Sequence, residues 1–119
     1  MLALVVDDDT FIRSFVQTIL LAEDFETVEA ADGDEALAIL QTRGGRVDLI
    51  VTDIHMPGRD GISVAHAVRD AFPAVEIILM SGYPKPECDF LFIQKPFTWI
   101  SMRNLIREVV QQAHLPPAA

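Results

Sequence analysis

The stretch Leu2–Thr10, LALVVDDDT, joins five consecutive apolar residues directly to three consecutive acids, Asp7, Asp8 and Asp9. A strand without alternating polar residues is typical of a parallel sheet that is covered on both faces. Three like charges at the end of such a strand repel one another, and burial would remove the water that solvates them. The stretch therefore predicts the first strand of an α/β domain and an acidic group, in need of a cation, at its carboxyl end.

Four further runs of β-branched and aliphatic residues predict strands. They lie at Phe25–Ala30, Val47–Thr52, Val75–Met80 and Phe90–Ile93. Between them apolar residues recur at the spacing of helices, as at Phe11, Phe15 and Ile19. The expected helices begin after Asp9 or Thr10 as N-cap, extend over Asp34–Leu40, extend from Ile62 to Phe72 before Pro73, and begin after Thr98 as N-cap. This alternation predicts a three-layer, doubly wound α/β domain with right-handed crossovers.

The connection between the fourth and fifth strands is unusually short. If the fourth strand ends near Ser81, only Gly82–Asp89 joins it to the fifth, and this segment contains Pro84 and Pro86. A parallel crossover normally needs about a dozen residues or more, usually with a helix. We therefore expect the fourth helix of the alternating pattern to be short or missing.

Composition and charge narrow the class of protein. The chain has 119 residues, of which half are apolar, so we expect one folded domain over residues 1–115 and a frayed tail at 116–119. A net charge of −9 disfavours direct binding to nucleic acid or to an anionic membrane. No apolar run approaches the roughly 20 residues that span a bilayer, and no signal peptide is recognisable, so we expect a cytoplasmic protein. Cys88, the single cysteine, cannot form an internal disulfide and is expected to be unreactive.

Polar side chains follow the other predicted strands as well. Asp53 follows the third strand, Ser81 the fourth and Lys95 the fifth. Because ligands of open parallel sheets bind beyond the carboxyl ends of the strands, these side chains should converge with Asp7 and Asp8. Clustered carboxylates suit Mg²⁺, and a carboxylate can attack phosphorus as a nucleophile while a hydroxyl and an ammonium hold the phosphoryl oxygens. The five residues predict Mg²⁺-dependent phosphoryl transfer.

Four segments carry a family resemblance, in the right order and on the right elements. They are LVVDDD (4–9), LIVTDIHMPGRDG (49–61), IILMSGY (77–83) and IQKPF (93–97). Together they resemble the receiver domain of two-component response regulators over essentially the whole chain. The resemblance implies a flavodoxin-like fold with a five-stranded parallel sheet in the order 2-1-3-4-5. It also implies that Asp53 is the phosphoacceptor, which takes its phosphoryl group from a histidine kinase or a histidine phosphotransfer protein.

The resemblance assigns roles to the surrounding residues. Asp8, Asp53 and the backbone carbonyl of His55 are implied as Mg²⁺ ligands, with Asp7 acting through a bound water. Ser81 is implied to turn toward the new phosphoryl group and Lys95 to form an ion pair with it.

Three further features of these segments compare with the family. The Lys95–Pro96 bond is similar to the family's cis bond, and Pro57 and Gly58 are implied to shape the loop after the acceptor. Phe92 occupies the place of the family's switch aromatic, commonly a tyrosine, and has no hydroxyl to donate. The SGYP segment with its short loop resembles receivers attached to hybrid histidine kinases.

Several residues near these segments have simpler interpretations. Asp9 is expected to cap the first helix rather than bind metal, and Trp99 to pack rather than recognise a partner. His66 and His114 lack metal-ligand spacing and are interpreted as ordinary surface or loop residues. The side chains of His55 and Tyr83 flank the acceptor and the hydroxyl, where we hypothesise that they gate water and tune the phosphate lifetime.

The functional prediction is a stand-alone phosphoreceiver that signals through contacts with a downstream protein. Met1 directly before the first strand favours a complete gene product without an output domain. The protein is not expected to be an enzyme beyond its own phosphotransfer and autodephosphorylation. One alternative is a degenerate receiver that binds partners without phosphorylation, which Phe92 and the short crossover favour. The other is a small Mg²⁺-dependent phosphatase, which the absence of a recognisable lid disfavours.

Overall fold

The computed structural model describes residues 1–112. The predicted tail at 116–119, the predicted domain end at residue 115 and His114 lie outside the described residues. In chain order the elements are β1 (Leu2–Val6), α1 (Thr10–Ala22), β2 (Glu26–Ala30), α2 (Gly33–Thr42), β3 (Leu49–Asp53), α3 (Gly61–Ala71), β4 (Glu76–Ser81), β5 (Leu91–Gln94) and α4 (Trp99–Gln112). All neighbouring strands are parallel and their order is β2-β1-β3-β4-β5, as predicted.

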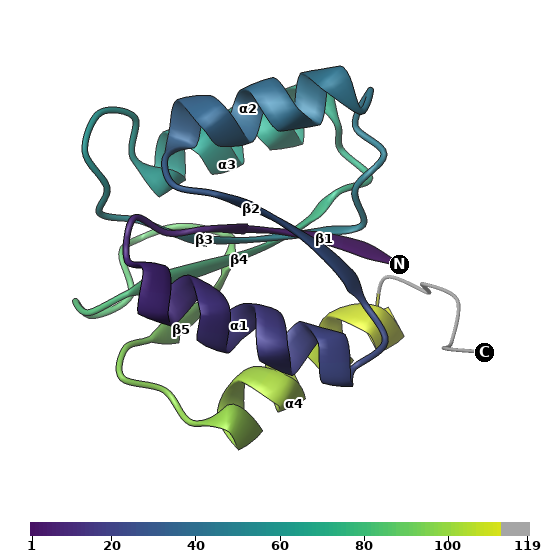
Figure 1. Cartoon of the computed structure of the whole chain (residues 1–119). Helices are drawn as coiled ribbons and strands as arrows, with labels where there is room; N and C mark the ends of the chain where they lie inside the picture. Colours follow the sequence, from purple (N-terminus) through teal and green to yellow (C-terminus); the bar gives the residue numbers. More distant parts are fainter. Residues whose placement is uncertain (113–119) are drawn as a thin grey trace.

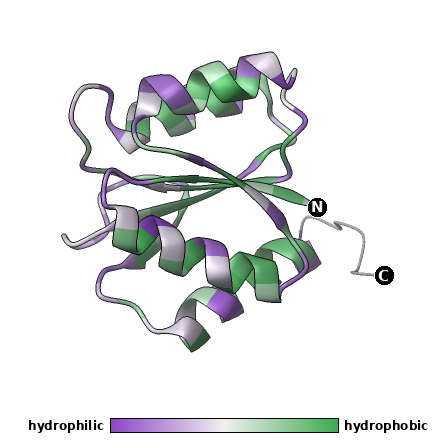
Figure 2. Cartoon of the chain, in the orientation of Figure 1, coloured by the Kyte–Doolittle hydropathy of each residue, from purple (hydrophilic) through white to green (hydrophobic). Residues whose placement is uncertain are grey.

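The sheet lies between two layers of helices (Figure 1), and an apolar core fills the space on each of its faces. Helices α2 and α3 cover one face, where Leu40 and Val68 pack against strand residues such as Ile50. Helices α1 and α4 cover the other face, where Ile19 and Ile106 pack in the second core. The central strands are hydrophobic nearly throughout, whereas each helix alternates between hydrophobic and hydrophilic residues (Figure 2). The interpretation of the first, third and fourth strands as buried on both faces is confirmed.

The helix ends follow from local capping. Asp9 accepts hydrogen bonds from the backbone N–H groups of Phe11 and Ile12 and caps α1, as the sequence suggested. Thr98 accepts from the N–H of Ser101 at the start of α4. Helix α2 begins at Gly33, capped by Asp32, and reaches Thr42, so it is longer at both ends than predicted. None of the helices within residues 1–112 is long and apolar enough to cross a membrane.

The short crossover after β4 contains no helix in the described part of the chain. Its far end is fixed to α3 instead, because the ring of Phe90 is almost fully buried and the guanidinium of Arg69 lies 4.0 Å from its centroid. The ring of His66 meets the same phenyl ring edge-on at 5.2 Å. Residues of α3 therefore hold the chain where a fourth crossover helix would otherwise cover the sheet.

Candidate functional site

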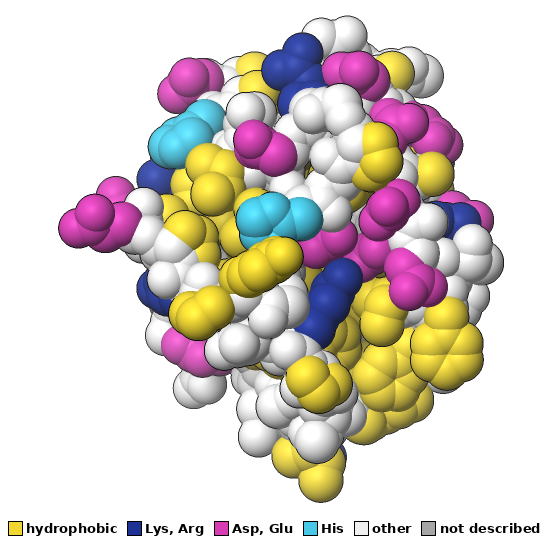
Figure 3. All heavy atoms as spheres, turned by 90° about the vertical axis from the view of Figure 1, so that its left-hand side faces the viewer, with side chains coloured by type: hydrophobic (Ala, Val, Ile, Leu, Met, Phe, Trp, Pro, Cys, Tyr) yellow, Lys and Arg dark blue, Asp and Glu magenta, His cyan; other side chains and the backbone are white. Residues whose placement is uncertain are grey.

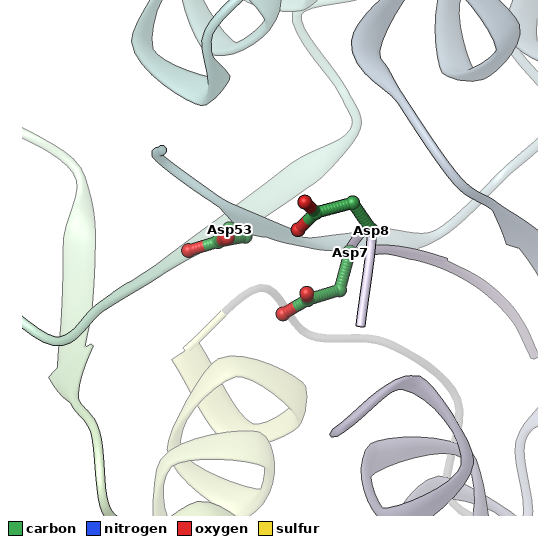
Figure 4. A group of neighbouring side chains, drawn as sticks. All are labelled: Asp7, Asp8 and Asp53. Atoms are coloured by element: carbon green, nitrogen blue, oxygen red, sulfur yellow. The ribbon is translucent and has the colours of Figure 1, made fainter. Parts of the chain in front are cut away.

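The carboxyl ends of the strands bring the predicted polar residues to one edge of the sheet. Asp7 directly follows β1, Asp53 and Ser81 end β3 and β4, and Lys95 directly follows β5. The carboxylates of Asp7 and Asp8 extend toward the side on which Asp53 lies (Figure 4). One oxygen from each of the three acids lies within 4.8 Å of the others. Seen from this edge, several acidic side chains gather next to a basic one, with hydrophobic side chains on either side (Figure 3).

Asp7 and Lys95 form the buried base of the cluster. Asp7 is fully buried, and its carboxylate accepts a hydrogen bond of 2.9 Å from the N–H of Asp9. The Nζ of Lys95 lies 2.8 Å from Oδ2 of Asp7 and 3.3 Å from Oδ1 of Asp53. One ammonium therefore bridges two carboxylates that come from different strands.

Burial dominates the electrostatics of Asp53. Desolvation raises the pKa of Asp53 above its usual 3.8, the charge of Asp7 raises it further, and Lys95 offsets only part of this rise. Desolvation alone would lower the pKa of Lys95. The hydrogen bond to Asp7 and the negative charges of Asp53 and Asp7 outweigh this effect, so the pKa of Lys95 is raised. The ammonium is thus held in its charged form, while ionised Asp53 lacks full compensation.

Asp8 and His55 lie on the open side of the cluster. Asp8 is exposed, in contrast to buried Asp7, and its carboxylate is free to face a cation. His55 lies two residues beyond Asp53 and is also exposed. Its ring meets the ring of Tyr83 edge-on, with centroids 4.8 Å apart.

Ser81 is buried beside the cluster but is turned to a different partner. Its Oγ accepts a 3.0 Å hydrogen bond from the N–H of Tyr83, and within residues 1–112 it makes none to Asp53 or Lys95. The N–H of Lys95 donates to the carbonyl of Ser81 at 2.7 Å, and the Lys95–Pro96 peptide is cis, as predicted. Phe92 is half-buried and packs against the core under α2 and α3, away from these polar atoms.

Two residues that support the site were not found from the sequence. Arg13 on α1 reaches back so that its Nη1 donates to the carbonyl oxygen of Asp7 at 2.7 Å. Gly61 begins α3 against the backbone at the end of β3, where a Cβ would overlap the carbonyl oxygen of Asp53 and lie 2.9 Å from Cα of Ile54. Because the sequence predicted this helix to begin at Ile62, Gly61 carried no signal of its contact with β3.

The aromatic residues near Lys95 pack as expected. Phe15 stacks on Phe97 with centroids 5.9 Å apart, and Trp99 meets Phe15 edge-on at 6.1 Å. The interpretation of Trp99 as a packing residue agrees with this contact, although its side chain is 37% exposed.

Comparison with known proteins identifies the family. The family model of the response regulator receiver domain matches residues 3–107. The chain belongs to this family. The receiver domain is 30% identical to the sensor kinase CckA of Brucella abortus over 117 residues. This match covers 92% of this chain and 12% of that protein. It is 44% identical to the probable transcriptional regulator ycf27 of Cyanophora paradoxa over 122 aligned positions, and this match covers 95% of this chain and 49% of that protein. It therefore spans only a part of each of these relatives.

Solved structures share the fold at similar identity. The receiver domain of the hybrid histidine kinase CckA superposes with a TM-score of 0.83 at 32% identity, covering 93% of this chain and all of the other. The response regulator TrrA of Thermotoga maritima, in complex with Mg²⁺ and BeF, superposes with a TM-score of 0.79 at 30% identity, covering 91% and 97%. The resemblance and the flavodoxin-like fold inferred from the sequence are confirmed.

Proposed function

We propose that this receiver domain is the phosphoacceptor of a two-component phosphorelay, with Asp53 as the residue that takes the phosphoryl group. The observation that carries the proposal is the ammonium of Lys95, 3.3 Å from Asp53 and 2.8 Å from Asp7. A fixed cation orients the nucleophilic carboxylate and can neutralise an oxygen of the transferred group. In the transfer, a carboxylate oxygen of Asp53 forms a P–O bond while the P–N bond of a phosphohistidine breaks, and the imidazole leaves.

The acidic cluster fits Mg²⁺. Its three carboxylate oxygens lie within 4.8 Å of one another, and hard divalent cations prefer oxygen ligands. We assign Asp8, Asp53 and the backbone carbonyl of His55 as the protein ligands and Asp7 as a residue that acts through a bound water. Bound Mg²⁺ supplies positive charge to the phosphoryl oxygens. Asp8 suits this role because it is exposed, whereas Asp7 already holds Lys95.

Ser81 and Lys95 are the residues that would contact the transferred group. Lys95 needs no large movement, because its ammonium already lies beside the acceptor oxygen. Ser81 must turn, since its hydroxyl accepts from Tyr83 in this structure. Phe92 stays a predicted switch residue that can move by packing alone, because it has no hydroxyl.

The partners follow from this chemistry. The phosphoryl donor is proposed to be a histidine kinase or a histidine phosphotransfer protein, and the relationship to a sensor kinase supports this class. The signal passes onward by contact with a downstream protein whose identity the chain does not encode. Apart from its self-catalysed phosphotransfer and the hydrolysis of its own aspartyl phosphate, the receiver is not proposed to act as an enzyme.

The test is to incubate the protein with Mg²⁺ and phosphoramidate or a phosphorylated histidine kinase, and to measure phosphate incorporation by intact-protein mass spectrometry. We expect one phosphoryl group per chain, lost in Asp53→Asn and in the presence of a chelator. Asp70→Asn is the matched control, because Asp70 is an exposed acid on α3 away from the cluster.

The outcomes separate the three candidate functions. Incorporation that depends on Asp53 supports the phosphoreceiver. Hydrolysis of many turnovers of varied phosphoesters would support the phosphatase instead. If no donor labels a folded protein in the presence of Mg²⁺, the proposal is wrong and the degenerate interaction module remains.

A further inference from the structure

The rings of His55 and Tyr83 connect the loop after the acceptor with the loop after Ser81. We propose that this ring pair is a latch, closed in the unphosphorylated receiver and opened when the hydroxyl of Ser81 turns to a phosphoryl group on Asp53. The inference rests on the proposed function and adds a means by which occupancy of the site changes its surface. It identifies Tyr83, rather than Phe92, as the aromatic residue that reports phosphorylation.

The first link is the hydrogen bond between Ser81 and Tyr83. The Oγ of Ser81 accepts from the N–H of Tyr83 at 3.0 Å, and Ser81 is only 1% exposed. A hydroxyl that turns to donate to a phosphoryl oxygen changes rotamer and moves its oxygen, so it cannot keep this bond. The N–H of Tyr83 then needs another partner, which the exposed loop can provide from solvent.

The second link is the contact between the rings. Tyr83 is 67% exposed, and its ring centroid lies 4.8 Å from that of His55 in an edge-on arrangement. Such pairs contribute a modest stabilisation beyond the area that they bury. Because His55 follows Asp53 by two residues and Tyr83 lies on the other loop, a shift of the Tyr83 backbone relative to the end of β3 separates the two rings.

The third link is the freedom of this part of the loop. No helix restrains Gly82–Asp89, whereas the far end is held where Arg69 packs on Phe90. Beside Tyr83 lies a groove of about 370 Å³, lined mainly by apolar side chains that include Ile62 and Pro86. The ring of Tyr83 therefore has space to leave His55 without disturbing a packed core.

Phe92 lacks a comparable connection. Its side chain packs against the core under α2 and α3, and it has no polar atom with which to follow the hydroxyl of Ser81. Tyr83 is bonded to Ser81 through its own backbone. The structure thus offers a direct path from the hydroxyl to one aromatic residue and only a packing path to the other.

The chain is suited to a direct test because Tyr83 is its only tyrosine. Labelling with 3-fluorotyrosine gives a single protein ¹⁹F resonance, which is recorded before and after addition of beryllofluoride with Mg²⁺. Bound beryllofluoride gives its own ¹⁹F signals, so the same spectrum reports occupancy of the site. We expect the resonance of Tyr83 to shift on binding toward the position that it has in unliganded His55→Ala.

The controls assign the shift to the latch. In Asp53→Asn no bound beryllofluoride and no shift are expected. In Phe92→Leu the shift of the Tyr83 resonance should persist. Bound beryllofluoride with an unmoved Tyr83 resonance would overturn the latch and leave the phosphoacceptor function intact. Failure of the wild-type protein to bind beryllofluoride or accept phosphate would instead overturn the proposed function, and the latch with it.

A binding measurement tests the same contact energetically. If the ring pair is made only in the empty state, removing either ring favours the occupied state. We expect His55→Ala and Tyr83→Ala each to bind beryllofluoride about two- to tenfold more tightly, as follows from the usual strength of an aromatic pair. The double variant should match the single variants, because both changes remove one contact. Unchanged or weaker affinity in folded Tyr83→Ala would contradict the latch.

Discussion

Replacing Gly61 by alanine is expected to destabilise the receiver, although it is a substitution that usually stabilises a helix. Gly61 is the first residue of α3, and its N–H donates to the carbonyl of Ile54 at 2.9 Å. A Cβ at this position would overlap the carbonyl oxygen of Asp53. The carbonyl of Asp53 and the Cα of Ile54, which a Cβ would meet, belong to the backbone and cannot rotate away, so relief requires movement of α3 or of the end of β3.

The magnitude follows from two opposing contributions. Exchange of glycine for alanine inside a helix normally gains up to about 1 kcal/mol. Overpacking of a close contact costs about 1–3 kcal/mol, and a backbone obstruction places Gly61 at the upper end. The net expectation is a loss of about 2 kcal/mol, which corresponds to a fall in Tm of about 8 °C for a domain of this size.

The assay is urea and thermal unfolding monitored by circular dichroism. The matched control is Gly82→Ala, because a Cβ at Gly82 meets no atom within 4 Å, and its stability should change by less than about 0.5 kcal/mol. Because the strain acts on Asp53 itself, phosphorylation of Gly61→Ala should also be slower than phosphorylation of the wild type. A Gly61→Ala variant at least as stable as the wild type would refute the reasoning.

Three further predictions concern the charged residues. Burial and then the charge of Asp7 raise the pKa of Asp53, so the native state binds this proton more tightly than the unfolded state, and the free energy of unfolding should fall as pH rises from about 3.8 through the native pKa. Urea titrations at several pH values should show a smaller fall in Asp53→Asn than in the wild type. Lys95→Met leaves the buried carboxylate of Asp7 without its cation and should lower the free energy of unfolding by about 3 kcal/mol at pH 7, a loss that added Mg²⁺ should reduce. A variant as stable as the wild type without Mg²⁺ would contradict the importance of the ion pair. Arg13→Gln removes the charged donor to the carbonyl of Asp7 and should cost on the order of 1.5 kcal/mol in the same assay, whereas Arg43→Gln, on the exposed end of α2, should cost little.

The sheet and the position of the site could be predicted because they depend on short-range pattern. Four of the five predicted strands end directly at a polar residue, the strand at Phe25–Ala30 being the exception, and parallel strands bring those ends to one edge whatever the loops do. Asp7 and Asp53 therefore lie together as a consequence of strand order, which the family resemblance implied. The short crossover was equally visible, since eight residues with two prolines leave no room for a packed helix.

The supporting contacts could not be predicted because they depend on how side chains cross between layers. The sequence places Arg13 on the first turn of a helix, where an arginine normally faces solvent, yet its side chain is 13% exposed and bonds to Asp7. Helical spacing also groups Phe11 with Phe15, but Phe11 lies 79% exposed at the start of α1. Periodicity gives the direction of a side chain around the helix axis and does not say whether another element covers that part of the helix.

The arrangement of charge explains why the site is poised to gain ligands. Three carboxylates lie close together, but the ammonium of Lys95 contacts only two of them, and it lies nearer to buried Asp7 than to Asp53. Burial, and then the negative charge of Asp7, keep the pKa of Asp53 raised even with Lys95 beside it, so its ionised form is not fully compensated. Under the proposed function, a divalent cation at Asp8 and Asp53 would relieve this repulsion, and a phosphoryl group would place new negative oxygens beside Lys95 and the hydroxyl of Ser81. Cation binding, phosphorylation and the turning of Ser81 are then expected to favour one another.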